Sequence, residues 1–173
     1  AGKSLFIEKP PCKDERELMS LTDTIKLYGS QHIVVGLQRR FAPATQILKK
    51  RLKGDGKRHY HYRYLTGLYP EGDTLLDLFI HPLDYVTFLF GEAKIKSLDV
   101  IRSRDGGQTL FLVLEHQEIT GMLELSTDYS WQDAQEQLSI STDRGLYVLE
   151  KMEQLDFTPR RSAVLGIPLE KVF

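Results

Sequence analysis

Aromatic and basic side chains alternate along the segment that begins at Lys57. The alternating residues are His59, Tyr60, His61, Tyr62, Arg63 and Tyr64. A period of two residues is the pattern of a β-strand, so a sheet is expected to begin here. Further candidate strands lie near residues 94–102, 110–116, 121–127, 137–141 and 146–150. Because Asp-Gly and Arg-Gly turn sequences separate several of them, we predict a large open sheet that is mainly antiparallel.

One long helix is expected between the tyrosine strand and the later strands. Its apolar residues recur at helical spacing from Asp73 to about Phe90 and form a broad face, which predicts packing on the sheet. Pro82 removes one helical hydrogen bond, so the helix either bends there or begins near His81.

The first third of the chain has a different order, in which two strands alternate with two helices. Residues 3–7 and 32–37 are read as short buried strands, and residues 14–28 and 43–52 as helices. This order is typical of an α/β domain. We therefore assign the chain to the α+β class, with the remnant of an α/β domain in residues 1–54 and a sheet domain in residues 55–173.

Composition excludes several classes of function. The chain has 23 basic and 24 acidic residues, so no overall field favours nucleic acid or an anionic membrane. A single cysteine suits a reducing compartment, and no apolar run is long enough to span a membrane, so a cytoplasmic location is expected. The chain starts with Ala1, close to its first strand, which leads us to expect a piece of a longer protein.

Two groups of residues could carry chemistry. Lys9 follows the first strand and precedes Pro10, so its ammonium should project from a strand end, where ligands bind in open α/β sheets. Asp77, His81 and Asp84 share one polar stripe of the long helix. A carboxylate beside an imidazole can raise its pKa and create a proton shuttle. The alternative is an ordinary solvent-facing side of a helix.

Three segments together resemble the glucose-fructose oxidoreductase, inositol dehydrogenase and rhizopine-catabolism (Gfo/Idh/MocA) family. They occur in the order and spacing of that family, and a late segment, LSISTDRG, is similar to its late strand and turn. The three segments are LFIEKPP, VGLQRRFAP and LLDLFIHPLDYVTFLFG.

The resemblance implies a Rossmann domain that binds NAD or NADP, followed by an open-sheet domain that forms the substrate pocket and subunit contacts. Glu8, Lys9 and Pro10 would lie near the nicotinamide. His81 would accept the proton of a substrate hydroxyl, with Asp77 beside it. Arg39 and Arg40 would lie at the pocket edge and hold a hydroxyl or a carboxylate of the substrate.

The implied function is an NAD(P)-dependent oxidoreductase acting on a secondary alcohol of a sugar or cyclitol.

Two departures from the family pattern matter. A bulky Phe79 stands where a small residue is usual and is expected to narrow the substrate pocket. No Gly-x-Gly-x-x-Gly occurs, so this chain alone is expected to bind no cofactor and to be inactive. The alternative is a non-catalytic sheet module, and in either case a homodimer or higher homo-oligomer through the sheet is expected.

Other candidates are weaker. His59 and His61 could offer two metal ligands, but no cysteine or carboxylate accompanies them at ligand spacing, so no metal is expected. The tyrosines of the first sheet strand could stack on nucleic acid, although core packing is favoured in a nearly neutral chain. Trp131 and Tyr129 lie in a polar segment and are either a lid or an interface anchor.

Overall fold

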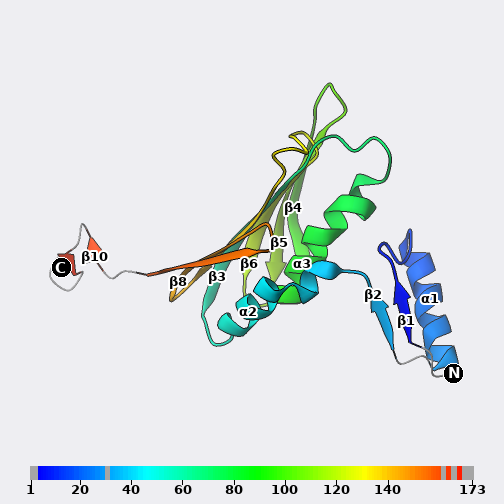
Figure 1. Ribbon diagram of the computed structural model, residues 1–173, viewed down its shortest axis with the longest axis horizontal. Helices are drawn as coiled ribbons and strands as arrows, with labels where there is room; N and C mark the ends of the chain where they lie inside the picture. The colour runs from blue at the N-terminus through cyan, green and yellow to red at the C-terminus, as the bar shows by residue number, and fades with distance from the viewer. Residues whose placement is uncertain (1–3, 30–31, 161–162, 165–166, 169–173) are drawn as a thin grey trace.

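The computed structural model describes residues 4–29, 32–160, 163–164 and 167–168. The chain begins with a small unit of β1 (Leu5–Ile7), α1 (Glu15–Tyr28) and β2 (Ile33–Val35), in which the two strands pair in parallel (Figure 1). Asp14 caps α1 by accepting a hydrogen bond from the Glu17 N–H at 2.9 Å. A strand, a helix and a second parallel strand make a βαβ unit, as the sequence predicted.

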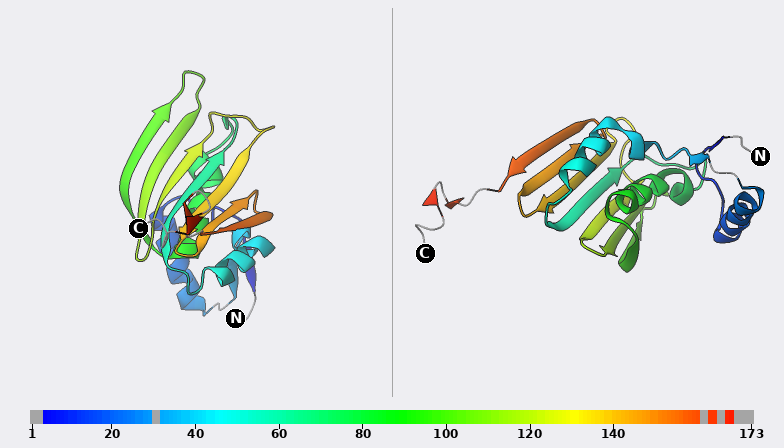
Figure 2. Two further views of the ribbon diagram at one scale, coloured as in Figure 1. Left: turned by 90° about the vertical axis from the view of Figure 1, so that its left-hand side faces the viewer. Right: turned by 90° about the horizontal axis from the view of Figure 1, so that it is seen from below.

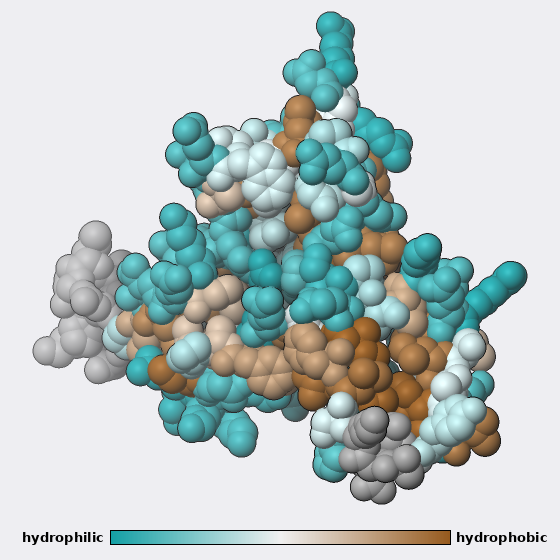
Figure 3. Space-filling model, turned by 45° about the vertical axis from the view of Figure 1, so that its right-hand side comes forward, coloured by the Kyte–Doolittle hydropathy of each residue, from teal (hydrophilic) through white to brown (hydrophobic). Residues whose placement is uncertain are grey.

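The prediction that both strands are buried is wrong. Leu5 and Phe6 of β1 are 51% and 61% exposed, and Val34 of β2 is 46% exposed. The physical reason is that α1 lies beside the two strands while no second layer within the described ranges covers them. Hydrophobic atoms therefore gather on the surface beside this unit, as Figure 3 shows.

A short connection joins this unit to the sheet. It consists of η1 (Gln38–Phe41), a 3₁₀ turn, and α2 (Pro43–Arg51), with Pro43 in the first helical turn. The buried side chains of α2 include Ala44 and Leu48, which join the core of the large sheet. The helix predicted from Pro43 is thus confirmed, and the domain boundary after residue 54 stays a prediction.

The main body is a seven-stranded mixed sheet. Its strand order is β4-β5-β6-β3-β7-β8-β9, in which the β3–β6 pair is parallel and the other pairs are antiparallel. The α+β class with a large, mainly antiparallel sheet is therefore confirmed, whereas β9 was not predicted. The strands are β3 (Lys57–Leu65), β4 (Ala93–Arg102), β5 (Gln108–His116), β6 (Thr120–Ser126), β7 (Gln135–Thr142), β8 (Gly145–Glu150) and β9 (Gln154–Pro159). A short antiparallel pair follows, β10 (Ala163–Val164) and β11 (Ile167–Pro168).

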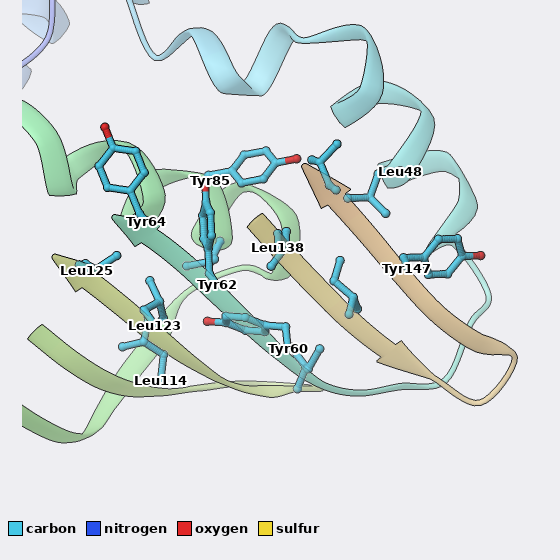
Figure 4. Close-up of a cluster of buried hydrophobic side chains, with 14 of the residues drawn as sticks. Leu48, Tyr60, Tyr62, Tyr64, Tyr85, Leu114, Leu123, Leu125, Leu138 and Tyr147 are labelled. Atoms are coloured by element: carbon cyan, nitrogen blue, oxygen red, sulfur yellow. The ribbon is translucent and has the colours of Figure 1, made fainter. Parts of the chain in front are cut away.

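The hydrophobic core lies between one face of the sheet and the helices α2 and α3 (Ile80–Phe90), which cover that face (Figure 2). Tyr60, Tyr62 and Tyr64 project from β3 into this core, where the Tyr62 ring lies beside that of Tyr85 (Figure 4). The first two tyrosines are 1% and 0% exposed. Core packing, the favoured interpretation of these tyrosines, is confirmed.

The long helix consists of two segments with different winding. A π-helical segment, η2 (Leu75–Phe79), runs directly into α3 at Ile80. Pro82 therefore lies within one continuous helical run, where it has no N–H to donate to the preceding turn. Phe79 is fully buried in the core, and the expected effect of its ring on the substrate pocket stays a prediction.

The opposite face of the sheet carries no helix in the described part of the chain (Figure 2). Nearly every residue of β4, at one edge, is exposed. No helix among the described residues is long and apolar enough to cross a membrane.

Candidate active site

Lys9 links the N-terminal unit to the long helix. The residue follows the end of β1 and precedes a cis peptide bond to Pro10. Its Nζ donates a hydrogen bond to the backbone carbonyl oxygen of Asp77 at 2.6 Å. Lys9 is partly buried, whereas the neighbouring Glu8 is exposed and its carboxylate lies against Gly36, just after β2. A side chain that leaves a strand end thus meets the π-helical segment, a feature common at functional sites.

The Asp77 carboxylate holds the segment that precedes the helix. Its Oδ2 accepts hydrogen bonds from the Asp73 N–H at 3.0 Å and from the Tyr69 hydroxyl at 3.4 Å. A Cβ added at Gly72 would lie 2.4 Å from the same oxygen, so glycine permits this close approach. Asp77 therefore fixes the entry to the helix through its carboxylate and receives Lys9 through its carbonyl.

His81 lies in the first turn of α3 and is half-buried. Burial, followed by the positive charges of Arg39 and Lys9, lowers the pKa of His81 to about 4, while Glu136 and Asp84 act in the opposite direction. The expectation that Asp77 raises this pKa is wrong, because the Asp77 carboxylate faces Asp73 and Tyr69. The imidazole is consequently neutral near pH 7 and can accept a proton.

Asp84, the third member of the polar stripe, is paired with Arg40. The Arg40 Nε donates to Asp84 Oδ2 at 2.9 Å, and Arg40 Nη2 donates to Asp84 Oδ1. The hydrogen bond to Asp84 raises the pKa of Arg40 above its ordinary value, although burial acts in the opposite direction. Arg40 thereby joins the η1 connection to α3, and its expected contact with substrate stays a prediction.

Arg39 takes part in a buried polar cluster that the sequence analysis did not identify. Its Nε donates to Glu136 Oε1 at 2.5 Å and its Nη2 donates to Glu136 Oε2 at 3.0 Å. The Tyr62 hydroxyl donates to Glu136 Oε1 at 2.5 Å, and the guanidinium lies 5.5 Å from the centre of the Tyr64 ring. Burial alone lowers the pKa of Arg39, but the hydrogen bonds and charge of Glu136 reverse this and raise it.

The sequence did contain one signal for Glu136. The residue shares the alternation of β7 with Leu138 and Ile140, which are buried on the core face. A carboxylate at a core position needs a cationic partner. Arg39 meets that need, and its expected role as a substrate ligand stays a prediction.

A cavity of about 220 Å³ opens beside this cluster. Six of its lining residues are Arg39, Tyr64, Thr66, Trp131, Glu136 and Lys151. We call it the Arg39–Lys151 cavity. The Trp131 indole N–H donates to the Leu68 carbonyl at 2.9 Å, and the ring lies against Gly67. Trp131 therefore forms a wall of this cavity, an arrangement that the sequence left open, while Tyr129 lines a different one.

No group of three or more potential metal ligands gathers anywhere in the residues that the structure describes. His59 and His61 project from the same side of β3, and the His61 Nε2 is buried with no hydrogen-bond partner among those residues. The two imidazoles are therefore not accompanied by a third ligand there.

Comparisons with known proteins show which proteins this chain resembles as a whole. No protein-family profile matches the chain. It is 28% identical over 162 residues to YceM of Salmonella typhimurium, a protein named as an oxidoreductase. The matched region covers 89% of this chain and 50% of YceM. The chain is 27% identical over 111 residues to an inositol 2-dehydrogenase of Acidothermus cellulolyticus, covering 60% of this chain and 32% of that one.

A solved structure, the WlbA dehydrogenase of Bordetella pertussis in complex with NADH and UDP-GlcNAcA, has a similar fold. The TM-score is 0.76 at 13% identity, covering 92% of this chain and 57% of that one. The curated relatives and the structural neighbours are oxidoreductases of the Gfo/Idh/MocA type, which confirms the resemblance. The chain spans half or less of the length of the curated relatives it matches.

Proposed function

We propose that this chain forms the substrate-binding and proton-transfer part of an NAD(P)-dependent oxidoreductase that acts on a secondary alcohol of a sugar or a cyclitol. One observation carries this proposal. The Lys9 ammonium reaches the Asp77 carbonyl at 2.6 Å, one helical turn from a neutral His81. A base that is free of its proton thus lies near a fixed positive charge, which is the arrangement that hydroxyl oxidation requires.

In the proposed reaction, the neutral His81 imidazole accepts the proton of the substrate hydroxyl. The Lys9 ammonium stabilises the negative charge that develops on the substrate oxygen as this proton leaves. Asp77 acts as a positioning residue, because its carbonyl orients Lys9 and its carboxylate fixes the start of the helix that carries His81. Arg39 adds a second positive charge that keeps His81 unprotonated.

A nicotinamide cofactor supplies a hydride acceptor when it is bound. The residues of this chain do not fit its diphosphate, because the connection from β1 to α1 contains Pro10 and Pro11, which have no N–H to donate. Glu8, Lys9 and Pro10 would face only the nicotinamide end. The proposal therefore leaves the choice between NAD and NADP to other parts of the longer protein and expects no cofactor binding by this chain alone. The single cysteine supports the further proposal of a reducing compartment such as the cytoplasm.

The test uses the longer protein that contains this chain, with NAD or NADP and myo-inositol or glucose as trial substrates. Formation of reduced nicotinamide is measured for Lys9→Met, His81→Ala and a matched control, Lys26→Met, which changes an exposed lysine of α1. The two site variants are expected to lose on the order of 10²–10⁴ in rate, and the control to keep it. Full turnover by His81→Ala would contradict the proposed role.

A second candidate function is a sheet module for self-association. It is supported by the exposed apolar side chains on and near β4, such as Ile95 and Ile101, which are 62% and 58% exposed. Sedimentation of the chain at micromolar concentration distinguishes a monomer from a dimer. A monomer at all concentrations would exclude this candidate, while a dimer whose Ile101→Lys variant dissociates would support it.

A further inference from the structure

We propose that the Arg39–Lys151 cavity binds a sugar unit that carries one anionic group, a carboxylate or a phosphate, and that Lys151 selects this anion. This inference rests on the proposed function, since it names a class of substrate for the cavity that shares Arg39 with the surroundings of His81. The cavity volume of about 220 Å³ is below the roughly 300–1,000 Å³ of drug-sized ligand sites, which limits the ligand to one small unit.

The charges around the cavity favour a single negative charge. Arg39 and Glu136 neutralise each other through two hydrogen bonds. Lys151 forms no ion pair within the described residues, and the neighbouring Glu150 carboxylate accepts a hydrogen bond from Gln137 at 2.9 Å. The lining therefore holds two cations and one anion, which leaves one positive charge at Lys151. An anionic group on the ligand would balance it.

The backbone at Lys151 is unusual for a lysine. Lys151 and Met152 have φ angles of 48° and 61°, in the left-handed region, at the turn between β8 and β9. Such turns usually contain asparagine or glycine, because a Cβ is unfavourable there. Residues kept in this conformation against their preference often serve a functional site.

The neighbours of this turn fix the backbone position of Lys151, whose side chain is exposed. The Lys151 N–H donates to the Glu136 carbonyl at 2.8 Å, which keeps it beside the strand that carries the buried carboxylate. Met152 packs against the hydrophobic core. The turn is thus attached on both sides, and a lysine rather than a glycine borders the cavity.

The remaining walls suit a carbohydrate. Trp131 is 52% exposed yet held by the Leu68 carbonyl, so its ring offers a fixed apolar surface to the C–H face of a sugar. Gln135, which is exposed, adds an amide that can hydrogen-bond to hydroxyls. Arg39 borders the cavity, and its charge also acts on His81, so the cavity and the proposed base share this arginine although His81 is not among the lining residues.

The experiment uses the single tryptophan of the chain as the reporter. The 173-residue chain is titrated with glucuronate, glucose 6-phosphate and glucose, and the indole N–H signal of Trp131 is followed by NMR. The anionic sugars are expected to bind roughly five-fold more tightly than glucose, as one partly exposed ion pair allows, and the preference should fall at high salt. A comparison of the affinities of glucuronate and glucose 6-phosphate tells whether the site prefers a carboxylate or a phosphate.

Three variants separate the outcomes. Lys151→Gln should abolish the preference for the anionic sugars, Lys151→Arg should retain it, and Lys26→Gln, at an exposed site on α1, should leave it unchanged. Equal affinity for charged and neutral sugars, no movement of the Trp131 signal with any of them, or a preference that survives Lys151→Gln would overturn the inference. If His81→Ala removes turnover of the longer protein while Lys151→Gln leaves the preference intact, the proposed function stands and this inference fails.

Discussion

Replacing Glu136 with glutamine removes one negative charge from the buried cluster that it forms with Arg39 and Tyr62. The side chains of Glu136 and Arg39 are only 16% and 18% exposed, so water replaces the lost partner only in part. The guanidinium then stays buried without a compensating charge, and one of its donors faces the amide N–H₂ of the new side chain. We therefore expect the Glu136→Gln variant to be strongly destabilised.

The magnitude follows from the geometry. Two charges about 4 Å apart interact by about 4 kcal/mol at an effective dielectric constant near 20. The amide oxygen retains part of the hydrogen bonding, including an acceptor for Tyr62. Breaking a buried ion pair from one side costs about 3–5 kcal/mol, and we expect about 3 kcal/mol of unfolding free energy for this change.

The assay is urea unfolding of the 173-residue chain, followed by circular dichroism. The matched control is Glu118→Gln, because Glu118 pairs with Lys57 but is 71% exposed. We expect the control to lose less than about 1 kcal/mol. An equal loss for the two variants, with unchanged denaturant slopes, would refute the argument that burial of the Arg39–Glu136 pair determines its contribution.

Three further predictions concern other parts of the molecule. The His81 pKa is about 4 when folded against 6.5 when unfolded, so the unfolded state binds more protons between these values. The contribution of His81 to the unfolding free energy is fully present above pH 6.5 and is lost as the pH drops towards 4. The loss is about 1–2 kcal/mol after allowance for solvent screening of the half-exposed ring. In His81→Gln, this pH dependence of the urea midpoint should disappear. Gly121→Ala should cost about 3 kcal/mol, because a Cβ there would lie 2.1 Å from the Tyr60 ring, and an unchanged melting temperature would contradict this. Lys151→Gly should raise the unfolding free energy by about 1 kcal/mol by relieving the left-handed backbone, which calorimetry can check.

The sheet and its core could be predicted because their pattern is local. The alternation of Tyr60, Tyr62 and Tyr64 identifies a strand with one buried face, and these tyrosines are at most 9% exposed. The apolar residues between Leu75 and Phe90 likewise predict a helix packed on that face. Lys9 was predicted to leave a strand end, and its contact with the long helix is consistent with that position.

Other features depend on partners far away in the sequence. Phe6 has the character of a buried strand residue, but composition does not tell whether a second layer covers it. Asp77 stands one turn from His81, yet its carboxylate turns towards Asp73. Glu136 shares the alternation of buried Leu138 and Ile140, but the sequence does not tell which cation pairs with it, and only the structure identifies Arg39.

The parallel pairing of β3 and β6 has a consequence for the kinetics of assembly. β3 is the central strand of the sheet, but its partners β6 and β7 come much later in the chain. Such non-local pairing must overcome the entropy of closing a long loop before it gains any contact, which slows folding. During synthesis on the ribosome, β3 emerges well before β6 and β7. It stays unpaired until they follow and can associate with other nascent chains. The yield of correctly assembled protein is therefore expected to depend on how quickly synthesis reaches residue 142.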